Sequence, residues 1–281
     1  MGAAGLIDIK KRIKSVESTR KITKAMGLVA TSKLRRIKNE LIDNEQYNNL
    51  CREVINEVIS SMPEDFDSIF YKSFDGDKLY IVLTSDTGLC AGYNSNIASY
   101  INKLVKNSNN SKLLVVGEKG ISHLSRHGIN THLEYLRLQD VPTTKEVNKI
   151  YNDAIYLYKK GEVSEVNIVY TEFISPVKQE VKSIKLIPLE KKFGQSGKYI
   201  IEPNEETVFD NAMDMYIKSQ IKTCMLSAKA SEHSARMMAM DAATENADEI
   251  LRNLRMKFNR IRQGIITQEI SEIVGGAEAQ K

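Results

Sequence analysis

The turn from Thr84 to Asn94 is the first place to look for chemistry, because it follows a short apolar run and reads Thr-Ser-Asp-Thr-Gly-Leu-Cys-Ala-Gly-Tyr-Asn. A glycine-rich turn between a strand and a helix can hold phosphate. Neither GxGxxG nor GxxxxGK[ST] is present, so Gly88 and Gly92 indicate a tight turn instead. Asp86-Thr87-Gly88 also matches an aspartic-protease loop, but that chemistry needs two carboxylates and no second such triplet exists.

The cysteines and histidines suggest no active site either. Cys90 has no evident histidine partner in the sequence and is expected to be a packed side chain. His123 and His127 have the spacing of a metal pair, yet Leu124 stands where a catalytic glutamate would be and no third ligand is suggested. His233 falls in a helical seam, where an isolated polar residue usually fixes register. We therefore expect no catalytic residue, no metal and no cofactor.

The elements around this turn predict an α/β domain over residues 75–200. Nearly continuous apolar runs predict strands that are buried on both faces. Thr143 and Glu146 have capping-box spacing, and Gly161 is a stop signal for the same helix. In chain order, the expected elements are strands over 79–84 and 113–116 with a helix over 95–106 between them, a helix from 143 to 161, and strands over 166–173 and 181–187 with Pro176 at their turn.

The last quarter of the chain predicts one long helix over residues 206–276. Steps of three and four residues from Phe209 to Ile265 meet mostly apolar side chains, which is a coiled-coil seam with polar interruptions. A continuous helix of this length would run roughly 100 Å, so it needs a long partner or a surrounding protein. After Ile265 the apolar positions slip register, which predicts a separate apolar tip formed by Ile266, Ile270, Ile273 and Val274.

The N-terminal segment 1–62 predicts a second long helix. Between Ile9 and Lys38 Glu17 is the only acid among many basic residues, which favours a polyanionic partner. Between Ile250 and Gln268 every charged residue is likewise basic. The apolar stripe of the N-terminal helix is expected to consist of Leu6, Ile9, Ile13, Val16, Ile22, Met26, Val29, Ala30, Leu34, Ile37 and Leu41.

The two long helices can bury their stripes on each other as an antiparallel pair, with the α/β domain as an insertion between them. The fold class is thus a two-helix coiled coil with an inserted, Rossmann-like α/β domain. The chain has 281 residues with 42% hydrophobic content, enough to bury a core. No run is long and apolar enough for a membrane span, and three scattered cysteines predict no disulfide frame, so a soluble protein of a reducing compartment is expected.

Four stretches of the sequence identify a family. In chain order they are Ser18–Met26 with its continuation to Leu34, Thr84–Asn94, Ala230–Met240 and Arg262–Val274. Together they closely resemble the gamma-subunit family of F-type rotary ATPases, in the same order along the chain. Thr87, Ala91 and Gly264 depart from residues that are common in that family, and they are minor differences.

This resemblance implies a non-catalytic central shaft that turns inside a ring of three alpha and three beta subunits. It implies an epsilon subunit and a membrane c-ring as further partners, and a peripheral position on the cytoplasmic face of a bacterial cell membrane without direct membrane insertion. It also implies that the apolar tip turns in a bearing. Carried over by matching positions, the expected contacts with the ring are Lys21, Lys24, Met26, Arg262, Gln263, Thr267 and Glu269.

Two other functions remain open at this point. A basic coiled coil that binds nucleic acid would account for the N-terminal basic stripe, because Lys and Arg along a helix suit phosphates. It accounts for neither the apolar tip nor the α/β insertion. An enzyme of the α/β domain is the third possibility.

Overall fold

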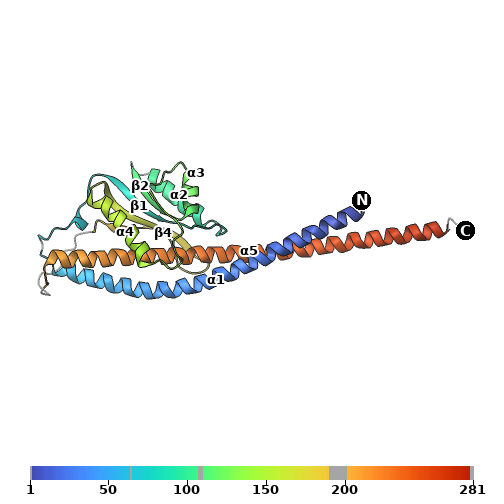
Figure 1. The fold of residues 1–281 in the computed structure, drawn as a ribbon, viewed down its shortest axis with the longest axis horizontal. Helices are drawn as coiled ribbons and strands as arrows, with labels where there is room; N and C mark the ends of the chain where they lie inside the picture. The colour runs from blue at the N-terminus through green and yellow to red at the C-terminus, as the bar shows by residue number, and fades with distance from the viewer. Residues whose placement is uncertain (1, 64, 107–109, 190–200, 279–281) are drawn as a thin grey trace. The chain divides into compact units, whose positions relative to one another are not determined.

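The structure, a computed structural model, describes residues 2–63, 65–106, 110–189 and 201–278. The chain forms two compact units, one made of Met1–Ala30 with Met237–Lys281 and the other of Thr31–Arg236. We call them the terminal unit and the central unit. Helix α1 (Gly2–Ser61) and helix α5 (Glu205–Glu278) each contribute to both (Figure 1). Both predicted long helices are confirmed.

The central unit contains a five-stranded sheet with the order β3-β2-β1-β4-β5. β1, β2, β3 and β4 run parallel, while β5 pairs with β4 in the antiparallel sense. The four predicted strands are confirmed, but the short edge strand β3 was not predicted. The strands are β1 (Asp77–Leu83), β2 (Ser111–Val116), β3 (Leu133–Tyr135), β4 (Val163–Phe173) and β5 (Gln179–Ile187).

Helices cover both faces of this sheet, which is why β1 is apolar at every position from Leu79 to Leu83. Tyr80 and Val82 of β1 pack with α2 (Tyr93–Lys106) and α3 (Glu118–Arg126). Leu79, Ile81 and Leu83 point to the other face and pack with α4 (Thr144–Lys159) and α5. Since successive strand residues point to opposite faces, a strand between two helical layers has to be apolar at every position.

The start and end of α4 follow the predicted local signals. The Thr143 side chain accepts a hydrogen bond from the backbone N–H of Glu146, and the Glu146 carboxylate accepts one from the backbone N–H of Thr143. These reciprocal bonds satisfy two helix N–H groups that lack partners within the helix. Gly161 follows the helix with φ of 72°, the left-handed conformation that glycine adopts without strain.

Within the central unit α1 and α5 pair in the antiparallel sense. The side-chain amide of Asn44 donates to the Thr223 hydroxyl at 2.8 Å, and that of Asn48 donates to the Gln220 side-chain oxygen at 2.8 Å. Partner numbers fall on α5 as they rise on α1. The opposite side of the same α5 segment packs on the sheet through Met213, Ile217, Ile221 and Met225.

The terminal unit is an antiparallel pair formed by the beginning of α1 and the end of α5. Thr23 and Thr244 share a hydrogen bond between hydroxyls at 2.8 Å, and Arg20 pairs with Asp248 at 2.6 Å. Polar interruptions of the two apolar stripes therefore meet each other. The seam that was predicted from Phe209 to Ile265 is confirmed, since each of its positions is buried or half-buried.

The expected apolar stripe of α1 was wrong at two positions. Ile22 and Val29 have 57% and 55% of their surface exposed. Thr23, Gly27 and Ala30 occupy the buried seam in their place. A Cβ on Gly27 would lie 3.5 Å from the Met240 Cβ and 3.2 Å from an oxygen of Asp241, so the lack of a side chain lets the two helices approach closely. At this level of the seam, small residues are thus favoured over larger apolar ones.

In the described part of the chain, no helix combines the length and the apolar character that crossing a membrane requires.

Candidate functional site

The Thr84–Asn94 turn is held by its own polar side chains. One carboxylate oxygen of Asp86 accepts hydrogen bonds from the backbone N–H groups of Glu118, at 3.2 Å, and Arg137, at 3.0 Å. Asp86 thereby links the ends of three segments at the carboxyl edge of the sheet. This is a structural use of the carboxylate, unlike the paired carboxylates of an aspartic protease.

The inner part of the turn is closed by Ser85, Cys90 and Asn94. The Asn94 amide donates to the Ser85 hydroxyl at 2.7 Å, while its carbonyl oxygen accepts from the Ser85 backbone N–H at 3.1 Å. Cys90 is 3% exposed, which confirms that it is a packed side chain. Burial raises the pKa of its thiol, so the protonated form is favoured rather than the nucleophilic thiolate.

Arg236 on α5 holds this turn from outside. Its guanidinium donates to the backbone carbonyls of Gly88, at 3.2 Å, and Thr87, at 3.1 Å, and to the Thr87 hydroxyl at 2.8 Å. It also pairs with the Glu232 carboxylate at 2.8 Å. Arg236 and Glu232 are only 6% and 3% exposed, so this is a buried pair whose remaining donors are satisfied by the turn.

A second set of buried contacts extends from Arg236 through His233. A guanidinium nitrogen of Arg236 lies 3.1 Å from Nδ1 of His233, and Nε2 of His233 lies 2.9 Å from an Asp140 carboxylate oxygen. Since Arg236 can only donate, Nδ1 accepts and the Nε2–H group donates to Asp140. The other Asp140 oxygen pairs with Lys33 of α1 at 2.9 Å. His233 therefore bonds to the α/β domain, which its position in the seam did not indicate.

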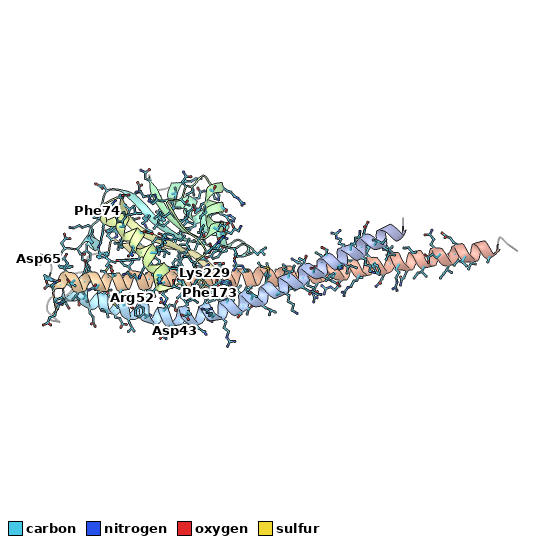
Figure 2. All side chains as sticks on the ribbon, in the orientation of Figure 1. Asp43, Arg52, Asp65, Phe74, Phe173 and Lys229 are labelled. Carbon is cyan, nitrogen blue, oxygen red and sulfur yellow. The ribbon has the colours of Figure 1, made fainter. Side chains whose placement is uncertain are left out.

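We call these side chains the Arg236 cluster; its members are Lys33, Thr87, Asp140, Lys229, Glu232, His233 and Arg236. Lys229, which is labelled in Figure 2, pairs with Glu232 at 3.0 Å and is 8% exposed. The cluster joins Ser18–Leu34, Thr84–Asn94 and Ala230–Met240, three stretches singled out in the sequence. It therefore connects α1, α5 and the α/β domain inside the central unit.

The Arg236 cluster was not predicted from the sequence. One available signal was the spacing of Lys229, Glu232 and Arg236, because residues at i, i+3 and i+7 form one charged stripe on a helix that is otherwise apolar. Lys33 and Asp140 carried no such signal. They lie far from α5 in the sequence and meet it only in the fold.

The residues predicted to contact a ring of partner subunits all lie in the terminal unit. Lys21 and Lys24 are exposed, and Met26 is half-buried. The predicted contacts at the other end of the pair, all of them exposed, are Arg262, Gln263, Thr267 and Glu269. Exposure leaves these side chains available to a partner.

The structure does not bring these two sets of residues together. Thr23 pairs with Thr244, so Lys21, Lys24 and Met26 lie near the level of residue 244 on α5. Arg262 is further along by 262 − 244 = 18 residues, roughly 27 Å at 1.5 Å per residue. The two sets of predicted contact residues are therefore separate along the helix pair.

Beyond Arg262 the side chains of the apolar tip are exposed. Ile266, Ile270, Ile273 and Val274 are 45%, 56%, 72% and 56% exposed. Side chains of this kind are usually buried, and several of them gathered on one helix end are typical of a surface that meets another protein.

Positive charge is concentrated just below the tip. Arg255 pairs with Glu17 at 2.7 Å, so the two basic segments lie along the same length of the helix pair. Among the residues that the structure describes, no carboxylate lies within ion-pair distance of the other basic side chains of this α5 segment, Arg252, Lys257, Arg260 and Arg262. We call this segment, with the basic beginning of α1, the basic collar.

His123 and His127 have the spacing of a metal-binding pair, but a metal site would need a third ligand beside them. Across the described ranges, no group of three or more His, Cys, Asp or Glu side chains could hold a metal ion. The three cysteines are free and buried.

Comparison with known proteins gives a consistent result over the whole chain. A family model described as ATP synthase matches residues 5–280. ATP synthase gamma chains from Clostridium botulinum and Clostridium beijerinckii are 53% and 51% identical, and each match covers all of both chains.

Solved structures give the same result for the fold. The central stalk and c-ring structure of Tetrahymena thermophila mitochondrial ATP synthase contains a chain with a TM-score of 0.62 and 25% identity, covering 79% of this chain and 99% of that one. A chain in the rotor of the Euglena gracilis mitochondrial ATP synthase has a TM-score of 0.72 at 15% identity, with 94% and 100% covered. Together with the paired helices and the four sequence stretches, these matches show that the chain belongs to the ATP synthase gamma chain family.

Proposed function

We propose that this chain is the central rotor shaft of a bacterial F1Fo ATP synthase. It couples rotation driven by ion flow to ATP synthesis, or ATP hydrolysis to ion pumping. The observation that carries this proposal is the full-length similarity to gamma chains, at 53% identity in the Clostridium botulinum relative. The terminal unit supports it, because a helix pair with an exposed apolar end and uncompensated positive charge is suited to a partner that surrounds it.

The partner of the terminal unit is a ring of three alpha and three beta subunits. Lys21, Lys24 and Met26 form one contact surface with it. The second surface consists of Arg262, Gln263, Thr267 and Glu269. Their separation along the helix pair suits a ring that encloses the shaft at two levels, and acidic loops of beta would face the basic collar.

The tip turns within the ring as in a bearing. Ile266, Ile270, Ile273 and Val274 carry no charge, so they would slide past an apolar sleeve without making or breaking ion pairs. A surface of this kind suits rotation, since strong directional contacts would hold the shaft at one angle.

Rotation can change the state of the ring subunits because the helix pair is asymmetric. One shaft faces three equivalent catalytic subunits, so each third of a turn presents a different side of the helix pair to each of them. A contact that favours the open or closed state of one subunit shifts its population accordingly. ATP is made and hydrolysed on these partner subunits, and this chain is a non-catalytic member of the complex.

The α/β domain over residues 75–200 and the nearby parts of 1–62 and 206–276 face the epsilon subunit and the membrane c-ring. The chain is then a peripheral protein on the cytoplasmic side of the bacterial cell membrane. It inserts no segment of its own into the bilayer, and it binds no nucleic acid. No specific observation favours the basic coiled-coil alternative or an enzyme of the α/β domain.

Affinity isolation from native cells tests this proposal. In this experiment, the chain would be tagged on its α/β domain and recovered from gently stripped membranes. The preparation would then be assayed for magnesium-dependent ATPase activity. We expect one tagged chain with three copies each of two larger subunits, and activity that the isolated chain lacks. Recovery of the chain alone, or with nucleic acid and without ATPase activity, would overturn it.

A further inference from the structure

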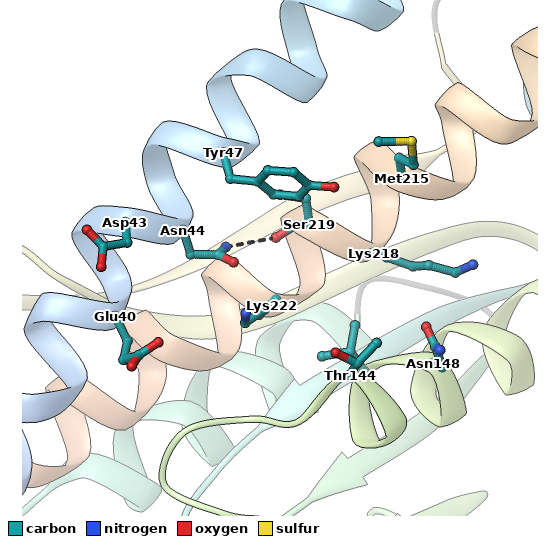
Figure 3. A pocket seen from close by; sticks show the side chains of 11 residues that line it. Glu40, Asp43, Asn44, Tyr47, Thr144, Asn148, Met215, Lys218, Ser219 and Lys222 are labelled. Atoms are coloured by element: carbon teal, nitrogen blue, oxygen red, sulfur yellow. Dashed lines mark hydrogen bonds between the residues drawn. The ribbon is translucent and has the colours of Figure 1, made fainter.

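A cleft in the central unit lies between α1, α4 and α5 and belongs to none of the surfaces described above. Its volume is about 470 Å³, within the range of roughly 300–1,000 Å³ that is typical of small-molecule sites. Figure 3 shows side chains from all three helices around it. We call it the Ser219 cleft; it is lined by Glu40, Asp43, Asn44 and Tyr47 of α1, Thr144, Val147 and Asn148 of α4, and Met215, Lys218, Ser219 and Lys222 of α5.

The charges of the cleft are divided between two of its walls. Glu40 and Asp43 stand on α1, while Lys222 stands on α5. Among the described residues none of the three has an ion-pair partner. Lys218 differs, because its ammonium group pairs with Asp214 at 3.1 Å and lies 4.7 Å from the centre of the Tyr151 ring. Unpaired charges of opposite sign therefore face one space without neutralising each other.

A buried hydroxyl at this cleft also lacks a partner. Ser219 is 4% exposed, and its Oγ atom has no hydrogen-bond partner in the structure. The neighbouring Asn44 amide donates to the Ser219 carbonyl at 3.4 Å and to Thr223, so it does not satisfy the hydroxyl (Figure 3). Buried polar atoms are nearly always hydrogen-bonded. Less than 1 Å² of the Ser219 oxygen is accessible, so a ligand atom in the cleft bonds to it once the side chain has turned to another rotamer.

We propose that the Ser219 cleft binds a small zwitterionic molecule of the amino-acid or short-peptide class. Its ammonium group pairs with Glu40 and Asp43, and its carboxylate pairs with Lys222. The Ser219 side chain turns to another rotamer, so that its hydroxyl bonds to a polar atom of the ligand. Val147 and Met215 give the cleft an apolar portion for a short aliphatic side chain. Charge-assisted bonds at both ends of one ligand would fix its orientation.

A ligand with a single charge fits this arrangement less well. A simple amine would leave Lys222 unpaired and add a positive charge to the cleft. A simple carboxylate would leave Glu40 and Asp43 unpaired and add a negative charge. Like charges in one cleft repel each other, so the zwitterion has the advantage over both.

Binding to the full-length chain can be measured with three forms of one dipeptide. The probes are glycyl-leucine, its N-acetyl derivative without the ammonium group, and its C-terminal amide without the carboxylate. The readout is the shift of the Asn44 and Asn148 side-chain amide signals in NMR titrations. We expect glycyl-leucine to bind in the millimolar range or tighter, and each blocked form to bind at least tenfold more weakly.

Substitutions of residues that line the cleft test whether glycyl-leucine binds there. Ser219→Ala is expected to fold as the parent chain does, because it removes a buried hydroxyl that has no partner, yet to weaken glycyl-leucine binding several-fold. Lys222→Gln should remove the preference for the free carboxylate. Glu53→Gln, on an exposed part of α1 outside the cleft, is the matched control and should bind like the parent chain.

Three outcomes would overturn the proposal. One is equal binding of the three dipeptide forms, and another is tighter binding of the amide, which would identify a site for simple cations. The third is the absence of any shift at Asn44 and Asn148 up to tens of millimolar dipeptide. Because the chain is studied alone, none of these results depends on its assembly into a rotor.

Discussion

Arg236 donates a hydrogen bond to the hydroxyl of Thr87 at 2.8 Å, so a residue of the long C-terminal helix closes the turn after the first strand. The same guanidinium also donates to two backbone carbonyls of that turn. In addition, it pairs with the Glu232 carboxylate and donates to the His233 ring. Its planar fork of donors serves all of these acceptors at once, which a lysine ammonium group could not do. A rotor that carries torque needs such a fixed junction between the α/β domain and the helix.

Replacing Arg236 with methionine is predicted to destabilise the central unit. The substitution leaves two partly buried turn carbonyls without this donor, and it leaves Glu232 with Lys229 as its remaining ion-pair partner. Removing one member of a buried pair costs about 3–5 kcal/mol of unfolding free energy. Urea unfolding of the full chain, followed by circular dichroism, measures this loss.

Arg252→Met is the matched control for that substitution. Arg252 is exposed on the same helix, so its replacement should change the unfolding free energy by no more than about 0.5 kcal/mol. Equal stabilities of the two variants would show that the Arg236 cluster does not hold the turn.

The acid stability of the chain should depend on Asp140. The hydrogen bond from His233, and after it the contact with Lys33, lower the pKa of this carboxyl below its ordinary value of 3.8, against the opposing effect of burial. A carboxyl with a lowered pKa in the folded state stabilises the fold above its unfolded pKa, and this stability is lost as the pH falls through the folded pKa. We expect this part of the stability to be constant at neutral pH and to decline below about pH 4.

The Asp140→Asn variant isolates this contribution. Asparagine can still accept a hydrogen bond from His233 but carries no charge. The variant should be less stable than the parent chain at pH 7, and the difference should shrink as the pH is lowered below about 4. A difference that is independent of pH would show that the charge of Asp140 is not what stabilises the cluster.

Much of the fold could be predicted because its signals are local and periodic. The seam from Phe209 to Ile265 repeats many times, so a few polar members did not hide it. Thr143 and Glu146 are three residues apart and form their capping box whatever the rest of the chain does. The change of register after Ile265 is visible in the sequence in the same way, and it sets the apolar tip apart from the seam.

The remaining features depend on contacts that sequence periodicity cannot show. Ile22 and Val29 are more apolar than Thr23 and Gly27, yet the smaller residues occupy the seam because close helix approach and a hydroxyl pair favour them there. Similarly, Asp140 enters the Arg236 cluster from a loop, and nothing in the surrounding sequence marks it. The ring-contact residues stay a prediction from the family resemblance.

Gly264→Ala is predicted to strengthen α5 near the tip. Gly264 lies inside the helix, and an added Cβ would meet no atom within 4 Å. Alanine should therefore stabilise the local helix by about 0.5–1 kcal/mol. Amide hydrogen exchange of residues 260–268 measures this effect, and it should slow by several-fold. Exchange that is unchanged or faster would contradict an unstrained helix at this position.

Arg262→Ala is predicted to weaken energy coupling while leaving the chain folded. Arg262 is exposed and has no carboxylate partner among the residues that the structure describes, so its removal should change the unfolding free energy by less than about 0.5 kcal/mol. In membranes that contain the assembled complex, we expect ATP-driven ion pumping to fall several-fold relative to ATP hydrolysis. The reason is the loss of a planar donor fork that would bind a carboxylate of the ring.

Two further variants distinguish this role from a general effect of charge or helix surface. Arg262→Lys keeps the charge without the fork and should retain part of the coupling. Asn259→Ala, exposed on the same stretch of helix, should couple like the parent chain. An Arg262→Ala chain that unfolds early with its α/β domain disrupted would show a structural role instead. Full coupling in that variant would remove Arg262 from the contact surface, because an exposed arginine that holds a partner carboxylate cannot be lost without effect.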